Sequence, residues 1–422
     1  MTPPAPPRRG LAADRKTVLN WQMLALAIGP GLVVMLADTE AGSVIAASQS
    51  GAEWGYRLVL PQFLLIPALF LAQELAARLG LATGQGLAQL VLRQVGRGAA
   101  GVLLAVLAAS CFGTLVTEFA GIAGVGEIFG VPVWQTTTIA AAGLLLIVWT
   151  GSYRSVELAA IVVGLCELAF VALAWMAHPA PGQFAAQVLQ MPLGNRGYLY
   201  LLAANLGTCV IPWAVFYQQS ASIDKGLTHA HVAAMRVETL LGAVLCQTVT
   251  AAVVVAAAAA FGHGRAAGLP LDRVGEIADA FSVAVGPGAG RLVFALGLSG
   301  GALVAAIVVS LTAAWGFGEV TGRRHSLSAS PREAPWFYGA FTLFVVASAA
   351  LIASGMSLVR VSVAAAVANA LLLPVVLWFL DRMARRMLPP ALRPARAAEL
   401  AARLVLGATA LVGFMCGIAG SL

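Results

Sequence analysis

Hydrophobic stretches of membrane-spanning length occupy most of the chain and are separated by short polar connections. A membrane helix needs about 20 largely apolar residues, and on this criterion we expect about eleven spans. Their expected ranges are 21–48, 58–79, 102–129, 131–150, 156–176, 198–220, 232–261, 292–319, 336–354, 358–380 and 400–418. The pattern predicts an all-α polytopic membrane protein, and the proline-rich, basic residues 1–20 are expected to form a disordered cytoplasmic tail.

Two of these spans are interrupted by polar or helix-breaking residues. The first contains the acids Asp38 and Glu40 before Gly42, with apolar sequence on both sides. The sixth contains Pro212, which has no N–H to donate and therefore frees the carbonyl of Thr208 about one turn earlier. Irregular backbone survives in a bilayer only where it is buried in protein or lines a watery cavity. We expect both helices to be unwound near the midplane.

The two interrupted spans lie five spans apart, so two halves built on them would have opposite orientations. Corresponding breaks in inverted halves are a strong sequence indication of a transporter substrate site. We therefore expect one repeat in residues 21–178 and a second in 197–384, joined by an extracellular connection at 179–196. A cytoplasmic linker and an eleventh helix are expected in residues 385–422.

The acids in the first break indicate what this site binds. Carboxylates at bilayer depth are costly and usually mark ion pathways. We expect a metal cation at Glu40 and Asp38, facing the freed carbonyl of Thr208. Three simpler interpretations stay open: acids at the membrane surface, an ordinary proline kink, and a structural role for Asp38 in bonding loose amides.

Composition supports a membrane protein and argues against several other classes. The 422 residues are 60% hydrophobic and 10% charged, with a mean hydropathy of +0.89, whereas a soluble domain carries about 25% charged residues. The net charge of +7 would suggest nucleic acid in a soluble protein, but here the basic residues lie between apolar segments. We expect an inner (plasma) membrane location. The distribution of Lys and Arg favours a cytoplasmic amino terminus and, with an odd span count, an extracytoplasmic carboxyl terminus.

Catalytic chemistry is not expected. The sequence contains no HExxH and no recognisable pairing of a nucleophile with a base. The five cysteines lie in apolar segments without CxxC spacing, which is typical of small buried side chains. We expect no cofactor, no nucleic acid and no obligate protein partner, only the lipid bilayer and a transported ion.

Three segments resemble the first two helices of the Nramp family of divalent metal transporters. They are GPG at residues 29–31, SGAEWGY at 50–56 and QELAARLGLATGQGLA at 73–88. The resemblance implies a LeuT-type fold of two inverted five-helix repeats plus one extra helix. The family's Asp-Pro-Gly-Asn motif falls on residues 40–43 and its Ala-x-x-Met-Pro-His motif on residues 208–213. The resemblance therefore implies a metal site formed by Glu40, Ser43, Thr208 and Asp38, with Ile211 only lining it.

The departures from these motifs predict which metal is carried. The family's methionine supplies a soft thioether, but Ile211 cannot coordinate a metal, and Ser43 replaces a longer amide. Carboxylate oxygens with retained water suit Mg²⁺, and Mn²⁺ prefers similar oxygen ligands. The pattern is closest to the Nramp-related magnesium transporter branch, and we expect uptake of Mg²⁺, Mn²⁺ or both by alternating access, with Fe²⁺ less favoured.

A second group of departures concerns protons. Proton-coupled members of the family use a His where this chain has Trp213, a second acid where it has Gly121, and an Arg pair in the ninth span, which here contains no Arg. These differences predict little or no proton coupling. Glu118, Trp213 and Asn369 are the candidates for a permeation or proton route. The alternatives are a proton-coupled Mn²⁺/Fe²⁺ transporter and a sodium-coupled carrier of small organic solutes.

Overall fold

The computed structural model describes residues 29–150, 153–262, 271, 273–355 and 358–421. The expected tail at residues 1–20 and the beginning of the first expected span lie outside the described residues. Within the described ranges the regular elements are all helices, which confirms the all-α fold class. The α-helices are α2 Pro30–Asp38, α3 Ala41–Trp54, α4 Val59–Thr83, α5 Leu87–Gln94, α6 Arg97–Ile128, α7 Val133–Thr150, α8 Tyr153–Gly164, α9 Ala169–Met176, α10 Pro181–Gln187, α11 Arg196–Cys209, α12 Pro212–Asp224, α13 Val232–Gly262, α14 Val274–Val285, α15 Pro287–Thr321, α16 Pro335–Ala353, α17 Leu358–Met387 and α18 Arg396–Ser421.

Four short 3₁₀ helices complete these elements: η1 Gly55–Leu58, η2 Leu165–Leu168, η3 His229–His231 and η4 Pro390–Leu392. Ten helical segments of the described chain are long and apolar enough to cross a membrane. The difference from the eleven expected spans arises near the amino end. There α3, η1 and α4 form one continuous segment, Ala41–Thr83, while α2, with nine residues, is too short to count.

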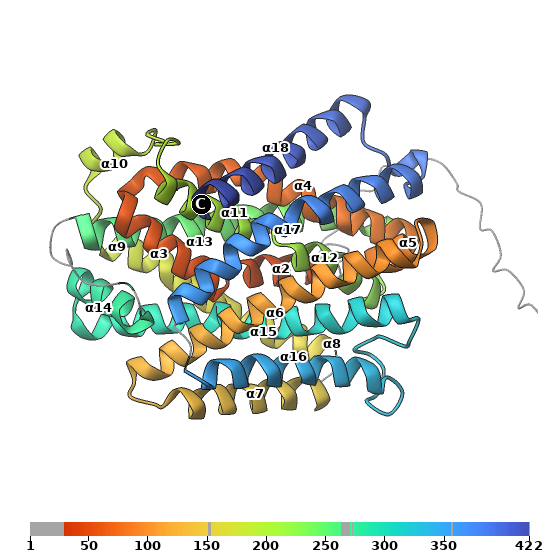
Figure 1. The fold of residues 1–422 in the computed structure, drawn as a ribbon, viewed down its shortest axis with the longest axis horizontal. Helices are drawn as coiled ribbons and strands as arrows, with labels where there is room; N and C mark the ends of the chain where they lie inside the picture. The colour runs from red at the N-terminus through yellow and green to blue at the C-terminus, as the bar shows by residue number, and fades with distance from the viewer. Residues whose placement is uncertain (1–28, 151–152, 263–270, 272, 356–357, 422) are drawn as a thin grey trace, which may run out of the picture.

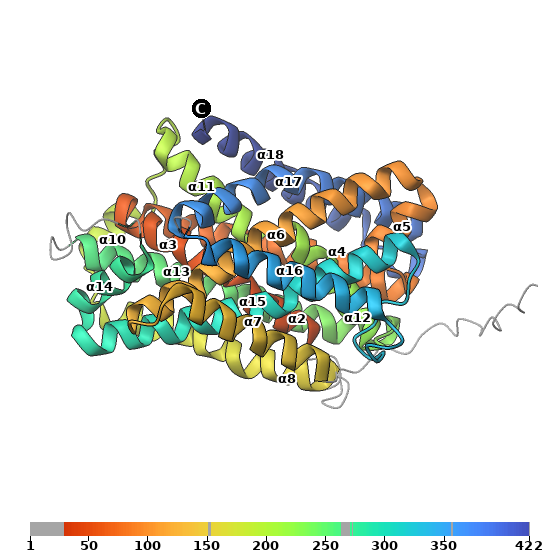
Figure 2. The same cartoon turned by 60° about the horizontal axis from the view of Figure 1, so that its bottom comes forward.

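The two broken helices lie inside the bundle, and all residues of α2 except Leu32 are buried. In the most apolar 18 residues of α11 and α12, 89% of the residues are buried. The corresponding value for α7, which is peripheral, is 22%. Figure 1 shows α7 and α16 along one edge and α18 along the opposite edge, and Figure 2 shows α8 on the outside of the same bundle. Helices α10 and α14 lie at one end of the molecule and α5 at the other.

Four long helices surround the breaks. Helices α13 and α15 both pack against α2, and α13 also packs against α3. Helix α6 packs against α15 and α17, and α17 in turn contacts α11. Residues from distant parts of the sequence can therefore meet at the two breaks.

Candidate functional site

The first break separates α2 from α3 by two residues. Helix α2 ends at Asp38, Thr39 leaves the helical conformation, and Glu40 is extended (φ −66°, ψ 170°) as the N-cap of α3. The expected unwinding is confirmed, but Gly42 lies in the first turn of α3 rather than in the break. The acidic side chain of Glu40 therefore stands at a helix amino terminus, where the helix dipole favours negative charge.

Gly42 keeps space open beside Glu40. A Cβ atom at Gly42 would lie 3.0 Å from Cγ2 of Thr117, 3.2 Å from Oε1 of Glu40 and 3.8 Å from Cγ2 of Thr208. Helices α3, α6 and α11 thus converge on this point. A larger side chain at residue 42 would press against the carboxylate.

The second break lies between α11 and α12. Helix α11 ends at Cys209, Val210 and Ile211 are not helical, and Pro212 begins α12. Proline is well tolerated at the first position of a helix because its missing N–H has no partner there in any case. The interruption expected at Pro212 in the sixth span is therefore confirmed. Pro212 cannot donate to the Thr208 carbonyl, while the Thr208 hydroxyl donates to the Asn205 carbonyl at 3.3 Å.

Glu40 and Glu118 form a buried pair at the first break. Their exposed fractions are 2% and 0%, and their carboxyl groups lie within hydrogen-bonding reach of each other. Oε2 of Glu118 also accepts the Ala41 N–H at 3.1 Å. Oε2 of Glu40 and Oε1 of Glu118 have no hydrogen-bond partner among the described residues. Adjacent carboxylates repel each other unless a proton or a cation lies with them, so this pair is suited to hold a cation.

A further buried acid was absent from the sequence prediction. Glu167 lies in η2, where the fifth expected span changes from α8 to α9, and it is 1% exposed. Neither carboxylate oxygen of Glu167 or of Asp38 has a hydrogen-bond partner in the part of the chain that the structure describes. The charges of these two acids interact with each other. An acid within an otherwise apolar span is the signal that could have identified Glu167.

Ser43 faces a different helix from Glu40. Its hydroxyl oxygen lies 3.5 Å from that of Thr250 on α13, and Thr250 donates to the Cys246 carbonyl at 3.1 Å. The described contacts therefore place Ser43 toward α13, whereas Glu40 faces Glu118 on α6.

Trp213 and Asn369 meet through α6. The indole N–H of Trp213 donates to the Thr114 hydroxyl at 3.2 Å, and the Asn369 amide donates to the same oxygen at 3.3 Å. Ser110 donates to the Asn369 carbonyl oxygen at 2.7 Å. Thr114 lies one helical turn before Glu118, so this neutral network adjoins the acid pair. An indole can only donate, so Trp213 offers no acceptor for a proton.

Gly121 occupies a position on α6 where an acidic side chain would not fit. A Cβ atom at this position would lie 2.5 Å from Cβ of Ala41. The close contact between α6 and the beginning of α3 leaves no room for an acidic side chain. Gly121 therefore permits the approach that brings Glu118 to the Ala41 N–H.

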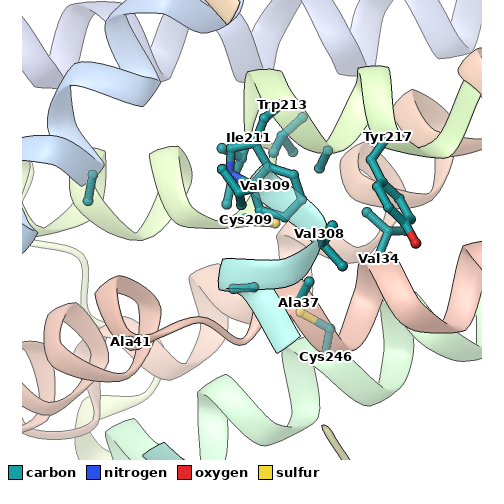
Figure 3. Packing of buried hydrophobic residues seen from close by; sticks show 14 of the residues in the cluster. Val34, Ala37, Ala41, Cys209, Ile211, Trp213, Tyr217, Cys246, Val308 and Val309 are labelled. Atoms are coloured by element: carbon teal, nitrogen blue, oxygen red, sulfur yellow. The ribbon is translucent and has the colours of Figure 1, made fainter. Parts of the chain in front are cut away.

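Apolar side chains fill the space between the breaks and the α5 end of the molecule. Figure 3 shows Val34 and Ala37 from α2, Trp213 and Tyr217 from α12, and Val308 and Val309 from α15. All six are at most 4% exposed. The cavity lined by Val33, Tyr217 and Val308 has a volume of only about 10 Å³, so these side chains pack closely.

Polar contacts stabilise the amino-terminal end of α2. The Glu238 carboxylate on α13 accepts the N–H groups of Gly29 at 2.6 Å and Leu32 at 2.8 Å. Beside them, Lys225 and Glu157 form an ion pair at 2.9 Å. Helix α2 is thus held at its amino terminus by a side chain of the helix that it packs against.

The donor set at the first break consists of oxygen atoms. No three His, Cys, Asp or Glu side chains of the described chain are grouped closely enough to hold a metal by themselves. Backbone carbonyls, hydroxyls or water would have to complete the coordination, as is common for Mg²⁺. The nearby sulfur atoms are already engaged, because Gln247 donates to Cys209 at 3.0 Å and Thr39 donates to Cys246 at 3.6 Å.

Comparisons with known proteins agree with this architecture. The chain is 28% identical to the divalent metal cation transporter MntH of Verminephrobacter eiseniae over 57% of each chain, so it spans little more than half of that relative. The Eremococcus coleocola manganese transporter, solved in complex with an aromatic bis-isothiourea substituted compound, superposes with a TM-score of 0.70 at 19% identity. The superposition covers 94% of this chain and 86% of the manganese transporter.

A second fold relative is more distant. A Na⁺-coupled sialic acid symporter superposes with a TM-score of 0.60 at 12% identity, over 95% of this chain and 94% of its own. These likenesses show an integral membrane fold of the LeuT type. The family model for natural resistance-associated macrophage protein-like (Nramp) proteins matches residues 31–419, nearly the whole chain, and the chain therefore belongs to the Nramp family.

Proposed function

We propose that this protein imports divalent metal cations, Mg²⁺ and Mn²⁺, across the plasma membrane by alternating access. The observation that carries this proposal is the pair of Glu40 and Glu118, buried at a helix break, each with one carboxylate oxygen that has no hydrogen-bond partner among the described residues. A divalent cation would neutralise both carboxylates at once. The MntH relative is named a divalent metal cation transporter, which supports the same substrate class.

Oxygen donors favour a hard cation in this proposal. Glu40, Glu118 and the carbonyl of Thr208 are the ligands we propose first, with Asp38 close by. Ser43 would join them only by turning away from Thr250. Ile211 lines the site without coordinating, so the soft donor that favours later transition metals is missing there.

Transport in this proposal needs little proton coupling. Trp213 cannot accept a proton, and Gly121 leaves no space for a second acid on α6. The membrane potential alone is sufficient, since two positive charges crossing 100 mV gain about 4.6 kcal/mol. We further propose a cytoplasmic amino terminus from the distribution of Lys and Arg.

Two other functions remain as competitors. Proton-coupled transport of Mn²⁺ or Fe²⁺ would suit the family membership. Sodium-coupled uptake of an organic solute would suit the fold that the chain shares with the sialic acid symporter. Against the second, the buried acids would repel the carboxylate of such a solute, and this favours a cation.

Uptake into proteoliposomes tests these proposals together. We expect Mg²⁺ and Mn²⁺ uptake driven by an inside-negative potential, loss of uptake in Glu40→Ala, and no amino acid uptake. The matched control is Glu127→Gln, because Glu127 pairs at 3.4 Å with the exposed Arg273, away from the break. Unchanged uptake in Glu40→Ala would overturn the site. A pH-sensitive dye that reports about one proton per metal would overturn the weak coupling.

A further inference from the structure

Asp38 and Glu167 constitute a second group of buried acids at the first helix break. Both side chains are at most 1% exposed, and their four carboxylate oxygens have no hydrogen-bond partner within the described ranges. Lone buried charges of this kind are strongly unfavourable unless a counter-charge accompanies them. No Lys or Arg makes a described ion pair with either acid, so the missing counter-charge must come from a bound cation or proton.

Helix α15 brings Glu167 and the first break together. A Cβ atom at Gly301 would lie 2.3 Å from the carbonyl oxygen of Thr39 and 3.4 Å from Oε1 of Glu167. At the neighbouring Gly300, a Cβ atom would lie 2.7 Å from the carbonyl oxygen of Val163. The Thr39 carbonyl oxygen and Oε1 of Glu167 therefore both face Gly301.

The break itself supplies a free backbone oxygen. Thr39 is outside both α2 and α3, and no described N–H donates to its carbonyl oxygen. The Thr39 hydroxyl lies within hydrogen-bonding reach of the Glu167 carboxylate and 3.6 Å from Sγ of Cys246. A carbonyl oxygen and two carboxylates are hard donors of the kind that Mg²⁺, Ca²⁺ and Mn²⁺ accept.

We propose that Asp38, Glu167 and the Thr39 carbonyl form a second divalent cation site, separate from the site of Glu40 and Glu118. Two carboxylates match the charge of one divalent ion. The second site faces α15 and η2, whereas the first faces α6. This inference rests on the proposed function, because it assigns the same class of ion to both sites.

The two sites influence each other electrostatically. The charge of Asp38 interacts with that of Glu40, and the charge of Glu118 interacts with that of Glu167. A cation in one site therefore reduces the attraction for a cation in the other. We expect the two ions to bind with different affinities. The ion that binds when the other site is already occupied should bind more weakly.

Binding of Mn²⁺ to the purified full-length protein tests the proposal. Equilibrium dialysis should give two Mn²⁺ per chain for the wild type and for Glu127→Gln, and one for Glu167→Gln. Glu40→Gln should also bind one. Electron paramagnetic resonance of the wild type needs no variant: two Mn²⁺ held on either side of a two-residue break should broaden each other's signal at saturation.

The outcomes separate this inference from the proposed function. A single Mn²⁺ that is lost in Glu40→Gln and kept in Glu167→Gln would overturn the second site and leave the first intact. A single Mn²⁺ that is lost in Glu167→Gln and kept in Glu40→Gln would overturn the two-site proposal together with the assignment of Glu40. Release of one of two Mn²⁺ by excess Na⁺ would overturn the divalent character of the second site.

Discussion

The carboxylate of Glu118 on α6 accepts the backbone N–H of Ala41, the first residue of α3, at 3.1 Å. The same carboxyl group lies beside Glu40, the N-cap of that helix. We expect two roles for Glu118 that can be separated by substitution. Its charge would serve the candidate cation site, and the hydrogen bond that it accepts stabilises the beginning of the helix that carries this site.

Glu118→Gln should remove the charge and keep the acceptor. We expect metal uptake to fall by about tenfold or more, which corresponds to about 1.4 kcal/mol, with little change in thermal stability. Glu118→Ala removes the acceptor as well and leaves the Ala41 N–H buried without a partner, which costs about 1–3 kcal/mol. Uptake assays and thermal unfolding of the two variants check the separation. Equal stability of Gln and Ala variants would contradict the capping role.

Gly121→Ala should destabilise the protein. The new Cβ would lie 2.5 Å from Cβ of Ala41, and overpacking of this kind costs about 1–3 kcal/mol. The matched control is Gly113→Ala on the same helix, where the nearest atom would be Cβ of Ala365 at an ordinary 3.6 Å. Thermal unfolding should show a lower midpoint for the first variant only. A midpoint unchanged in both would show that α6 and α3 can move apart without cost.

Ile211→Met should shift metal preference. Ile211 is fully buried in the second break, and a Met of similar volume would add a soft thioether there. We expect the affinity for Mn²⁺ to rise about tenfold relative to Mg²⁺, or about 1.4 kcal/mol. Titration calorimetry with both ions measures the ratio. Ile211→Leu controls for shape, and the same shift in this variant would exclude sulfur ligation as its cause.

Glu238→Ala should loosen the amino-terminal end of α2. The substitution removes the acceptor for the N–H groups of Gly29 and Leu32, and loss of such a cap costs about 1–2 kcal/mol. Hydrogen exchange should accelerate in residues 30–38 by about tenfold for each 1.4 kcal/mol, while α7 stays unchanged. Glu238→Gln keeps an acceptor oxygen and should lie between wild type and Ala. Unchanged exchange in Glu238→Ala would show that α2 is held by its apolar contacts alone.

The breaks in both central helices could be predicted from local sequence. Acids within an apolar run indicate the first, and Pro212 indicates the second, because each conflicts with a regular helix in lipid. The position of the first break could not be predicted to the residue. It depends on Glu118, which is 77 residues away from Ala41 and accepts its N–H.

The composition of the site could be predicted only in part. Trp213 and Asn369 meet at Thr114, from which they are separated by 99 and 255 residues, so no local pattern reveals their contact. The side of α3 to which Ser43 points is decided by the packing of α13. Glu167 was missed although its signal is local, because the family resemblance pointed to acids in the third span and to none in the fifth. The repeat boundaries and the magnesium preference stay predictions.

Gly300 and Gly301 have a mechanical consequence for the whole bundle. One glycine lies against the backbone of α8 and the next against the carbonyl of Thr39, so α8 and the first break rest on consecutive positions of α15. A tilt of α15 would displace both together. Motion of α8 relative to the first break therefore involves sliding along Gly300 and Gly301. A methyl group added at either position would hinder that motion.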